Sequence, residues 1–101
     1  MKSKKNDNFL QELYSVIEKR AKGKDDKSYT RSLIKEGKDK IAEKLAEEST
    51  ELIVDYLQGT KKRVVEEASD LIYHLLVMLY SKKITLNDIK KELSRRKNVR
   101  Q

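Results

Sequence analysis

The chain has no proline and only three glycines among its 101 residues, so it contains few residues that interrupt a helix. Its apolar residues recur three and four positions apart over long stretches, which is the spacing of one face of an α-helix. We find no strand pattern and no internal repeat. The sequence therefore predicts an all-α fold, a bundle of about four helices joined by short loops.

Four segments carry the helical pattern, and capping residues mark their ends. Gly59 stops one helix and Thr60 starts the next, while Asp88 takes the place of the usual glutamate in a capping box. Gly37 is a weak point near the start of the second helix. The helices are predicted over residues 7–22, from 28–30 to about Leu57, over 61–81 and from Thr85 onward.

Length and composition favour a single domain over residues 1–101, in which we expect residues 1–8 and 97–101 to be flexible. The chain has no cysteine, which excludes a disulfide framework and a thiolate metal site. No apolar run approaches the roughly 20 residues that a membrane-spanning helix needs. The first eight residues are polar, without the apolar segment of a signal peptide, so we expect a cytoplasmic protein.

Charged residues make up 41% of the chain, and the net charge is +7. Such an excess of lysine and arginine attracts phosphate, either of nucleic acid or of a small substrate that carries several phosphates. The simpler interpretation is a solvated helical surface with basic ends. Charge alone does not decide between these interpretations.

In the second helix, one carboxylate occupies a position where a core leucine is expected. Ile41, Leu45 and Leu52 define an apolar stripe at helical spacing, and Glu48 falls within it. Glu51, three residues further on, lies at the edge of the stripe. A buried carboxylate without a compensating positive group is costly, so this position calls for a chemical explanation.

The third helix presents a similar pair of carboxylates. Glu67 borders the apolar side of this helix, and Asp70 lies three residues beyond it in a more lateral position. His74 follows Asp70 by four residues, and we interpret it as a surface or interface histidine in preference to a metal ligand. The apolar residues expected on the buried side are Val64, Ala68, Leu71, Ile72, Leu75, Met78 and Leu79.

If the two helices pack antiparallel through the turn at Gly59, the two pairs of carboxylates face each other. Four carboxylates that close would repel one another and partly protonate unless a cation lay between them. Mg²⁺ fits an all-oxygen site, and Mn²⁺ is an alternative, whereas zinc would favour histidine or cysteine. For any single glutamate in so charged a chain, pairing with a lysine is the simpler explanation.

The order and spacing of these segments resemble phosphoribosyl-ATP pyrophosphatase, within the MazG-like superfamily of all-α nucleoside triphosphate pyrophosphatases. The resemblance covers about residues 9–96. The carboxylate pattern by itself indicates the superfamily, and the remaining motifs indicate this member. The motifs are SYT at 28–30, EExxE at 47–51 with Lys44 three residues before it, ExxD at 67–70 and DLxYH at 70–74.

This resemblance implies hydrolysis of 1-(5-phosphoribosyl)-ATP between its α and β phosphates, which gives 1-(5-phosphoribosyl)-AMP and pyrophosphate in the second step of histidine biosynthesis. It also implies a homodimer whose helices complete one another's core and active site. The chain carries no domain for the following cyclohydrolase step and so resembles the stand-alone form of the enzyme.

Within this hypothesis, the metal ligands are Glu48, Glu51, Glu67 and Asp70. The catalytic carboxylates are Glu47, Glu48 and Glu51, of which Glu47 either supports the ligands or binds an additional ion. The substrate-binding residues are Arg20, Ser28, Thr30, Lys40 and Lys44, with Ser28 and Thr30 acting beside the free N–H groups of a helix start.

Three other functions are considered. A house-cleaning pyrophosphatase would use the same metal site on free nucleoside triphosphates. A basic helical module would bind nucleic acid through residues 61–63 and 95–97, and a plain dimerisation domain would have no catalytic site. Both non-enzymatic alternatives leave Glu48 in the apolar stripe unexplained, so we rank them below the two hydrolases.

Overall fold

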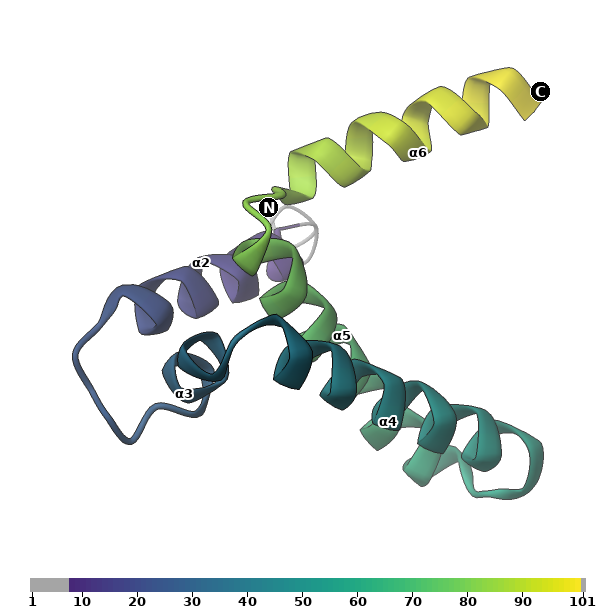
Figure 1. Cartoon of the computed structure of the whole chain (residues 1–101). Helices are drawn as coiled ribbons and strands as arrows, with labels where there is room; N and C mark the ends of the chain where they lie inside the picture. The colour runs from purple at the N-terminus through teal and green to yellow at the C-terminus, as the bar shows by residue number, and fades with distance from the viewer. Residues whose placement is uncertain (1–7, 101) are drawn as a thin grey trace.

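The computed structural model describes residues 8–100, with side chains through residue 98. Every regular element in this range is a helix, which confirms the predicted all-α class (Figure 1). No helix in the described part of the chain is long and apolar enough to cross a membrane. The helices are α2 (Phe9–Lys22), α3 (Tyr29–Glu36), α4 (Lys38–Gln58), α5 (Lys61–Ser81) and α6 (Leu86–Arg100).

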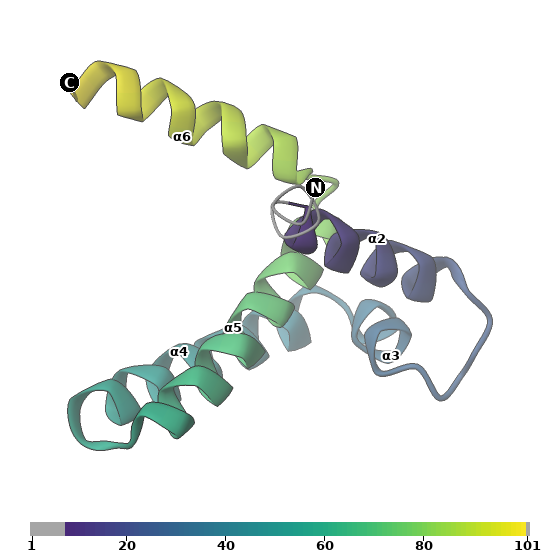
Figure 2. The ribbon, with the colours of Figure 1, turned by 180° about the vertical axis from the view of Figure 1, so that it is seen from behind.

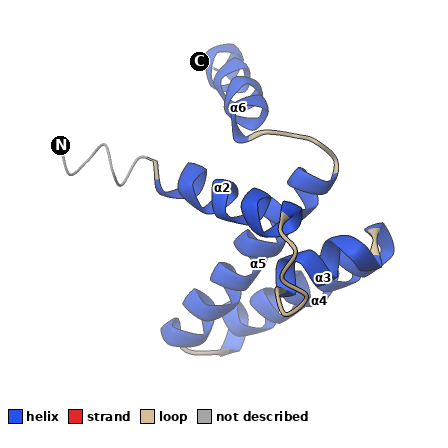
Figure 3. Cartoon of the chain, turned by 90° about the vertical axis from the view of Figure 1, so that its left-hand side faces the viewer, coloured by secondary structure: helices blue, strands red, loops and turns tan. Residues whose placement is uncertain are grey.

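The two longest helices, α4 and α5, form an antiparallel hairpin that accounts for the largest helix–helix contact in the protomer (Figures 1 and 2). Helices α2 and α3 pack near the end of the hairpin that is far from its connecting loop. Helix α6 projects away from the other four helices, as the view from the side shows (Figure 3). The hairpin is therefore covered at one end only.

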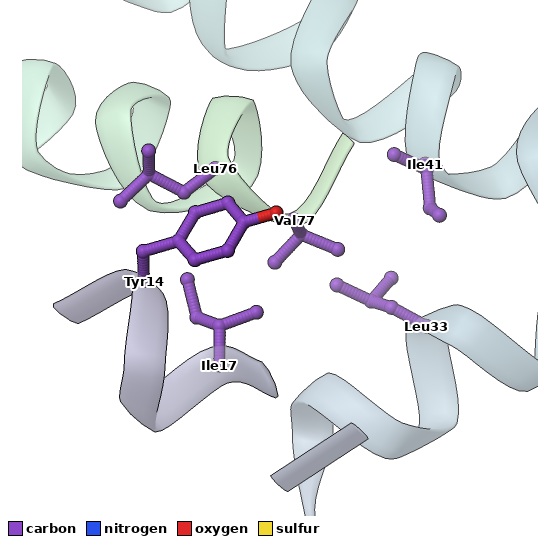
Figure 4. Close-up of a cluster of buried hydrophobic side chains, with 6 residues drawn as sticks. All are labelled: Tyr14, Ile17, Leu33, Ile41, Leu76 and Val77. Carbon is purple, nitrogen blue, oxygen red and sulfur yellow. The ribbon is translucent and has the colours of Figure 1, made fainter. Parts of the chain in front are cut away.

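The hydrophobic core lies where α2, α3, the start of α4 and the end of α5 meet (Figure 4). The Tyr14 hydroxyl donates a hydrogen bond of 2.8 Å to the carbonyl oxygen of Ile84, which ties α2 to the segment after α5. Burial of each large apolar side chain contributes about 1.5–3 kcal/mol, so this cluster anchors the four helices. Its members are Tyr14, Ile17, Leu33, Ile41, Leu76 and Val77.

The capping predictions are confirmed. The Ser28 hydroxyl accepts a 3.2 Å hydrogen bond from Arg31 N–H at the start of α3, and Thr60 starts α5 in the same way. Before α6, Thr85 N–H donates to the Asp88 carboxylate and Asp88 N–H donates to the Thr85 hydroxyl. These bonds satisfy N–H groups that a helix start leaves without partners.

The predicted second helix is in fact two helices, α3 and α4, and this explains why the described chain has five helices instead of about four. The break falls at Gly37, whose backbone adopts φ 96° and ψ −174°. Residues with a side chain rarely adopt this conformation, so glycine allows the chain to turn between the two helices.

We expect Gly37→Ala to lower the free energy of unfolding by about 1–3 kcal/mol through backbone strain alone. A Cβ at Gly37 would meet no atom within 4 Å, so a steric clash adds nothing. Urea unfolding at fixed protein concentration measures the change, with Gly23→Ala as the control. Gly23 has an ordinary φ of −73° and room for a Cβ. Equal effects of the two substitutions would contradict a role for strain.

The prediction for the buried side of α5 is partly wrong. Ile72 and Leu75, expected inside, are exposed in the protomer. The single chain covers one side of α5 with α2, α3 and α4, whereas the helix is apolar on a wider arc. The buried residues of α5 are Glu67, His74, Leu76 and Val77.

The ends of the chain fall partly outside the described range. The segment 1–8, which we expect to be flexible, lies outside the described residues up to residue 7, as does residue 101. The helix α6 extends to Arg100 and thus includes most of residues 97–101. Within α6, Arg95 and Arg96 both donate hydrogen bonds to Glu92.

Candidate active site

The α4–α5 hairpin sets which residues of the two helices face each other. Asp55 and Arg63, which lie four residues before and after Gly59, are in contact, with 3.6 Å between Oδ2 and Nη2. The same antiparallel register places Glu51 opposite Glu67 and Glu48 opposite Asp70. The structure therefore brings the two predicted carboxylate pairs to one section of the hairpin.

Glu48 is buried, as its place in the apolar stripe indicates, with an exposed fraction of 8%. Its Oε1 atom contacts Nδ1 of His74, but this oxygen is buried without a correctly oriented hydrogen bond. Burial raises the pKa of the Glu48 carboxyl above its usual range, and nearby Asp70 adds to the rise. His74 and Lys44 act in the opposite direction and lower the pKa of Glu48.

Glu67 is the second buried carboxylate, with an exposed fraction of 6%. Arg63, one turn earlier on α5, donates a 2.7 Å hydrogen bond to Glu67 Oε2. The other oxygen, Oε1, is buried and has no hydrogen-bond partner. An oxygen in this position is costly unless a positive group binds it.

The remaining predicted carboxylates lie on the surface near this pair. Glu51, Asp70 and Glu47 are exposed, and Glu47 lies 3.6 Å from the Lys44 ammonium. Among the described residues, no three carboxylates or histidines are already arranged to hold a metal ion. In this protomer, therefore, Arg63 contacts Glu67 and His74 contacts Glu48.

The donor set nevertheless fits a hard divalent cation. Glu48 and Glu67 each present one buried carboxylate oxygen without a hydrogen bond, and these oxygens come from facing helices. Oxygen donors are the ligands that Mg²⁺ and Mn²⁺ prefer. Glu51 and Asp70 are exposed, so rotation of their side chains could add further oxygens without disturbing the core.

His74 is the functional candidate that the sequence interpretation placed wrongly. We expected a surface or interface histidine, but its exposed fraction is 5% within the protomer. Its Nε2 atom lies 2.6 Å from the Tyr29 hydroxyl, and Nδ1 lies 2.9 Å from the carbonyl oxygen of Asp70. The spacing from Asp70 to His74 indicated a shared helix side, but the arrival of Tyr29 from α3 could not be read from that spacing.

Tyrosine and threonine side chains extend this buried polar cluster. Tyr29 stacks on Tyr73, with ring centroids 6.4 Å apart, and the Tyr73 hydroxyl contacts the Thr30 hydroxyl. Thr30 is fully buried, so its side chain is directed into the protein and not toward a ligand in solution. Tyr73 therefore combines aromatic packing with a hydroxyl contact.

The other predicted substrate-binding residues are on the surface. Lys40 lies 3.1 Å from Glu43, and Lys44 pairs with Glu47 as described above. Arg20 lies on the wall of a cavity of about 730 Å³ at the start of α3, between α2 and the following loop. The cavity is lined by Val16, Lys19, Arg20, Gly23, Asp25, Lys27, Ser28 and Tyr29.

The two helices of the hairpin carry buried carboxylates on their facing sides, and the chain also has the SYT and DLxYH motifs. Together these features define an all-α pyrophosphohydrolase. A family model described as Phosphoribosyl-ATP pyrophosphohydrolase matches residues 10–97. The chain belongs to this family.

Curated relatives agree with the assignment. Phosphoribosyl-ATP pyrophosphatase of Sulfolobus acidocaldarius is 50% identical over 89% of this chain and 95% of its own length. The protein of the same name from Metallosphaera sedula is 45% identical over 86% of this chain and 94% of its own length. The Histidine biosynthesis bifunctional protein HisIE of Thermotoga maritima is 42% identical over 88% of this chain but only 45% of its own length.

Proposed function

We propose that the protein hydrolyses 1-(5-phosphoribosyl)-ATP between its α and β phosphates to 1-(5-phosphoribosyl)-AMP and pyrophosphate. Family membership supports the reaction, and the relatives named for histidine biosynthesis support its place as the second step of that pathway. The observation that carries the proposal is the pair of buried carboxylates, Glu48 on α4 and Glu67 on α5, each of which has one oxygen without a hydrogen bond.

The proposed cofactor is Mg²⁺, with Mn²⁺ as a substitute, held by Glu48, Glu51, Glu67 and Asp70. When bound, such an ion neutralises phosphate oxygens and lowers the pKa of a bound water. The two buried ligands are fixed by their helices, whereas Glu51 and Asp70 are free to adjust. Because the burial of Glu48 and Glu67 excludes water from their inner oxygens, their attraction for a cation is stronger than it would be on an open surface.

The side chains of the protein would then move the proton and balance the charge. The reaction consumes one water, breaks the bridging P–O bond between the α and β phosphorus atoms, and releases a proton. We assign that proton to the exposed carboxylates of Glu47 and Glu51, which lie one residue before and three residues after Glu48. Lys44, one turn before Glu48, would release Glu47 and approach the phosphate charge.

Phosphate binding is proposed at the start of α3. Ser28 caps this helix and lines the same cavity as Arg20, so a phosphate there would lie beside the helix start, where free N–H groups attract anions. Since Thr30 is buried, its proposed contribution runs through its backbone N–H. Lys40 would approach the substrate only after leaving Glu43.

We also propose that the protein is a homodimer and that it works in the cytoplasm. Large apolar side chains on the uncovered part of the hairpin support the dimer, because a second copy would remove them from water. These side chains are Ile53, Val54, Tyr56 and Leu57 on α4 and Val65, Ile72 and Leu75 on α5.

A pyrophosphate-release assay tests the substrate assignment. With Mg²⁺ present, phosphoribosyl-ATP should be hydrolysed with a kcat/KM at least about 100-fold above that for ATP or dUTP, a ratio typical of one well-recognised group. Comparable rates on all three substrates would contradict the proposal and support a house-cleaning pyrophosphatase. A nucleic-acid-binding module would show no hydrolysis. Arg63, one of the basic residues that such a module would use, already forms ion pairs with Glu66 and Glu67.

Lys44→Ala should raise the KM for phosphoribosyl-ATP about 10-fold, because a charge-assisted contact to phosphate contributes about 1.5–3 kcal/mol. Initial-rate kinetics at saturating Mg²⁺ measure the change, and the circular dichroism spectrum should not change. Lys35→Ala serves as the control, since Lys35 is an exposed lysine on α3. An unchanged KM in Lys44→Ala would remove this residue from the phosphate site.

A further inference from the structure

The two nitrogens of the buried His74 imidazole contact three polar groups. Tyr29 approaches its Nε2 atom from α3, with 2.6 Å between the atoms. On the opposite side of the ring, Nδ1 lies 2.9 Å from the Asp70 carbonyl oxygen and also contacts Oε1 of Glu48 on α4. One ring therefore connects α3, α4 and α5 at the buried end of the carboxylate pair.

The partners of the ring determine which nitrogen carries the proton. Both groups at Nδ1, the Asp70 carbonyl and the Glu48 carboxylate, are acceptors, so the proton of the neutral imidazole belongs on Nδ1. Nε2 is then an acceptor, and the Tyr29 hydroxyl donates to it. This arrangement satisfies both ring nitrogens and selects one ring orientation.

The fixed ring restricts Glu48 in turn. With Nδ1–H directed at the Asp70 carbonyl, Glu48 Oε1 lies against the ring without a hydrogen bond of its own. The carboxylate is thus held in one place by an N–H dipole and by burial, while its oxygen remains available. Carboxylates that bind metals are commonly held by such partners, whose removal weakens metal binding.

We propose that His74, fixed between the Tyr29 hydroxyl and the Asp70 carbonyl oxygen, is a positioning residue that holds the Glu48 carboxylate for divalent-cation binding. The inference rests on the proposed function, because it assumes that Glu48 is a metal ligand. It adds that α3 contributes to metal affinity through Tyr29, although α3 supplies no ligand.

The experiment compares two tyrosines in direct titrations of the intact chain with Mn²⁺, without substrate, followed by the electron paramagnetic resonance signal of free Mn²⁺. Tyr29→Phe removes the hydroxyl that holds His74 and should weaken Mn²⁺ binding about 10-fold. Tyr73 stacks on Tyr29, but its hydroxyl contacts Thr30 and not His74. Tyr73→Phe removes this hydroxyl and should leave the affinity for Mn²⁺ unchanged. Tyr29 is half-exposed, so the first variant should fold.

Substitutions of His74 itself separate positioning from packing. His74→Phe keeps a ring but loses both nitrogens, and should weaken Mn²⁺ binding by about 10–100-fold. His74→Asn places an amide N–H near the position of Nδ1 and should recover most of this loss. In steady-state kinetics, His74→Phe should need proportionally more Mn²⁺ for half-maximal rate, with the KM for phosphoribosyl-ATP unchanged at saturating Mn²⁺.

The outcomes separate the inference from the proposed function. If the unaltered chain binds no Mn²⁺, the proposed metal site is wrong and the inference fails with it. If the unaltered chain binds Mn²⁺ but Tyr29→Phe and Tyr73→Phe bind equally well, only the positioning role of His74 is wrong. Should His74→Phe fail to fold, the comparison of the two tyrosines decides the question.

Discussion

Glu48→Gln should lower the rate of Mg²⁺-dependent pyrophosphate release by at least about 100-fold, the scale of losing one electrostatic group in an active site. Glutamine matches glutamate in shape but carries no charge, so it cannot hold a cation with the same strength. The side chain is buried beside His74, and the substitution leaves that packing in place. Initial rates with phosphoribosyl-ATP over a range of Mg²⁺ concentrations measure the effect.

The same substitution should not destabilise the metal-free protein. Burial raises the pKa of Glu48, which means that the fold disfavours its charged form at neutral pH. Glutamine removes that charge, so thermal unfolding in the presence of a chelator should occur at the same temperature or higher. Glu12→Gln, which changes an exposed glutamate on α2, is the control for activity. Full activity of Glu48→Gln would remove the central ligand assignment.

Ile53→Arg should convert the proposed dimer to a monomer and reduce pyrophosphate release with it. Ile53 is 58% exposed in the protomer, so an arginine there costs the isolated chain little. In a symmetric dimer the substitution would occur twice and would place two charges in an apolar interface. Sedimentation equilibrium should show the mass falling toward that of the single chain, 11.9 kDa.

Leu93→Arg is the matched control for this experiment. Leu93 lies on α6 and is 59% exposed, which is nearly the same as Ile53, but it lies outside the hairpin. The proposal expects Leu93→Arg to remain a dimer with normal activity. Dissociation by Leu93→Arg alone would place the interface on α6, and a monomeric unaltered chain would contradict the dimer itself.

Much of the local structure could be predicted because it depends on neighbours in sequence. The hydroxyl of Ser28 and the Thr85–Asp88 pair cap helices with bonds to residues three positions away, so the sequence shows both partners. The break at Gly37 was identified only as a weak point. Whether a glycine bends a helix or ends it depends on how α3 and α4 pack, which local spacing does not reveal.

Burial could be predicted only where one helix face was unambiguous. The stripe of α4 correctly placed Glu48 inside, because leucine and isoleucine flank it at helical spacing. Helix α5 is apolar over a wider arc, so the sequence did not show that Leu75 is exposed while His74 is buried. The contact from Tyr29 depends on the packing of α3 against α5, and no spacing within one helix predicts it.

For the predicted metal site, helix geometry could be predicted from the sequence, but the side-chain contacts that depend on packing could not. The spacing of three residues between Glu67 and Asp70 correctly places both on α5, and the turn at Gly59 brings them opposite α4. The pairing of Glu67 with Arg63 was not anticipated, although the two residues are four positions apart. Such a pair is one of several that this charged helix could form, so packing selects it.

The location of a bound cation tests most directly whether α4 and α5 hold a metal together. Crystals grown with Mn²⁺ and measured near its absorption edge should give an anomalous peak between the two helices. We predict the peak within about 2–2.6 Å of carboxylate oxygens from both Glu48 and Glu67. Well-ordered crystals without a peak there, in which Glu48 contacts only His74 and Glu67 binds only Arg63, would contradict the account.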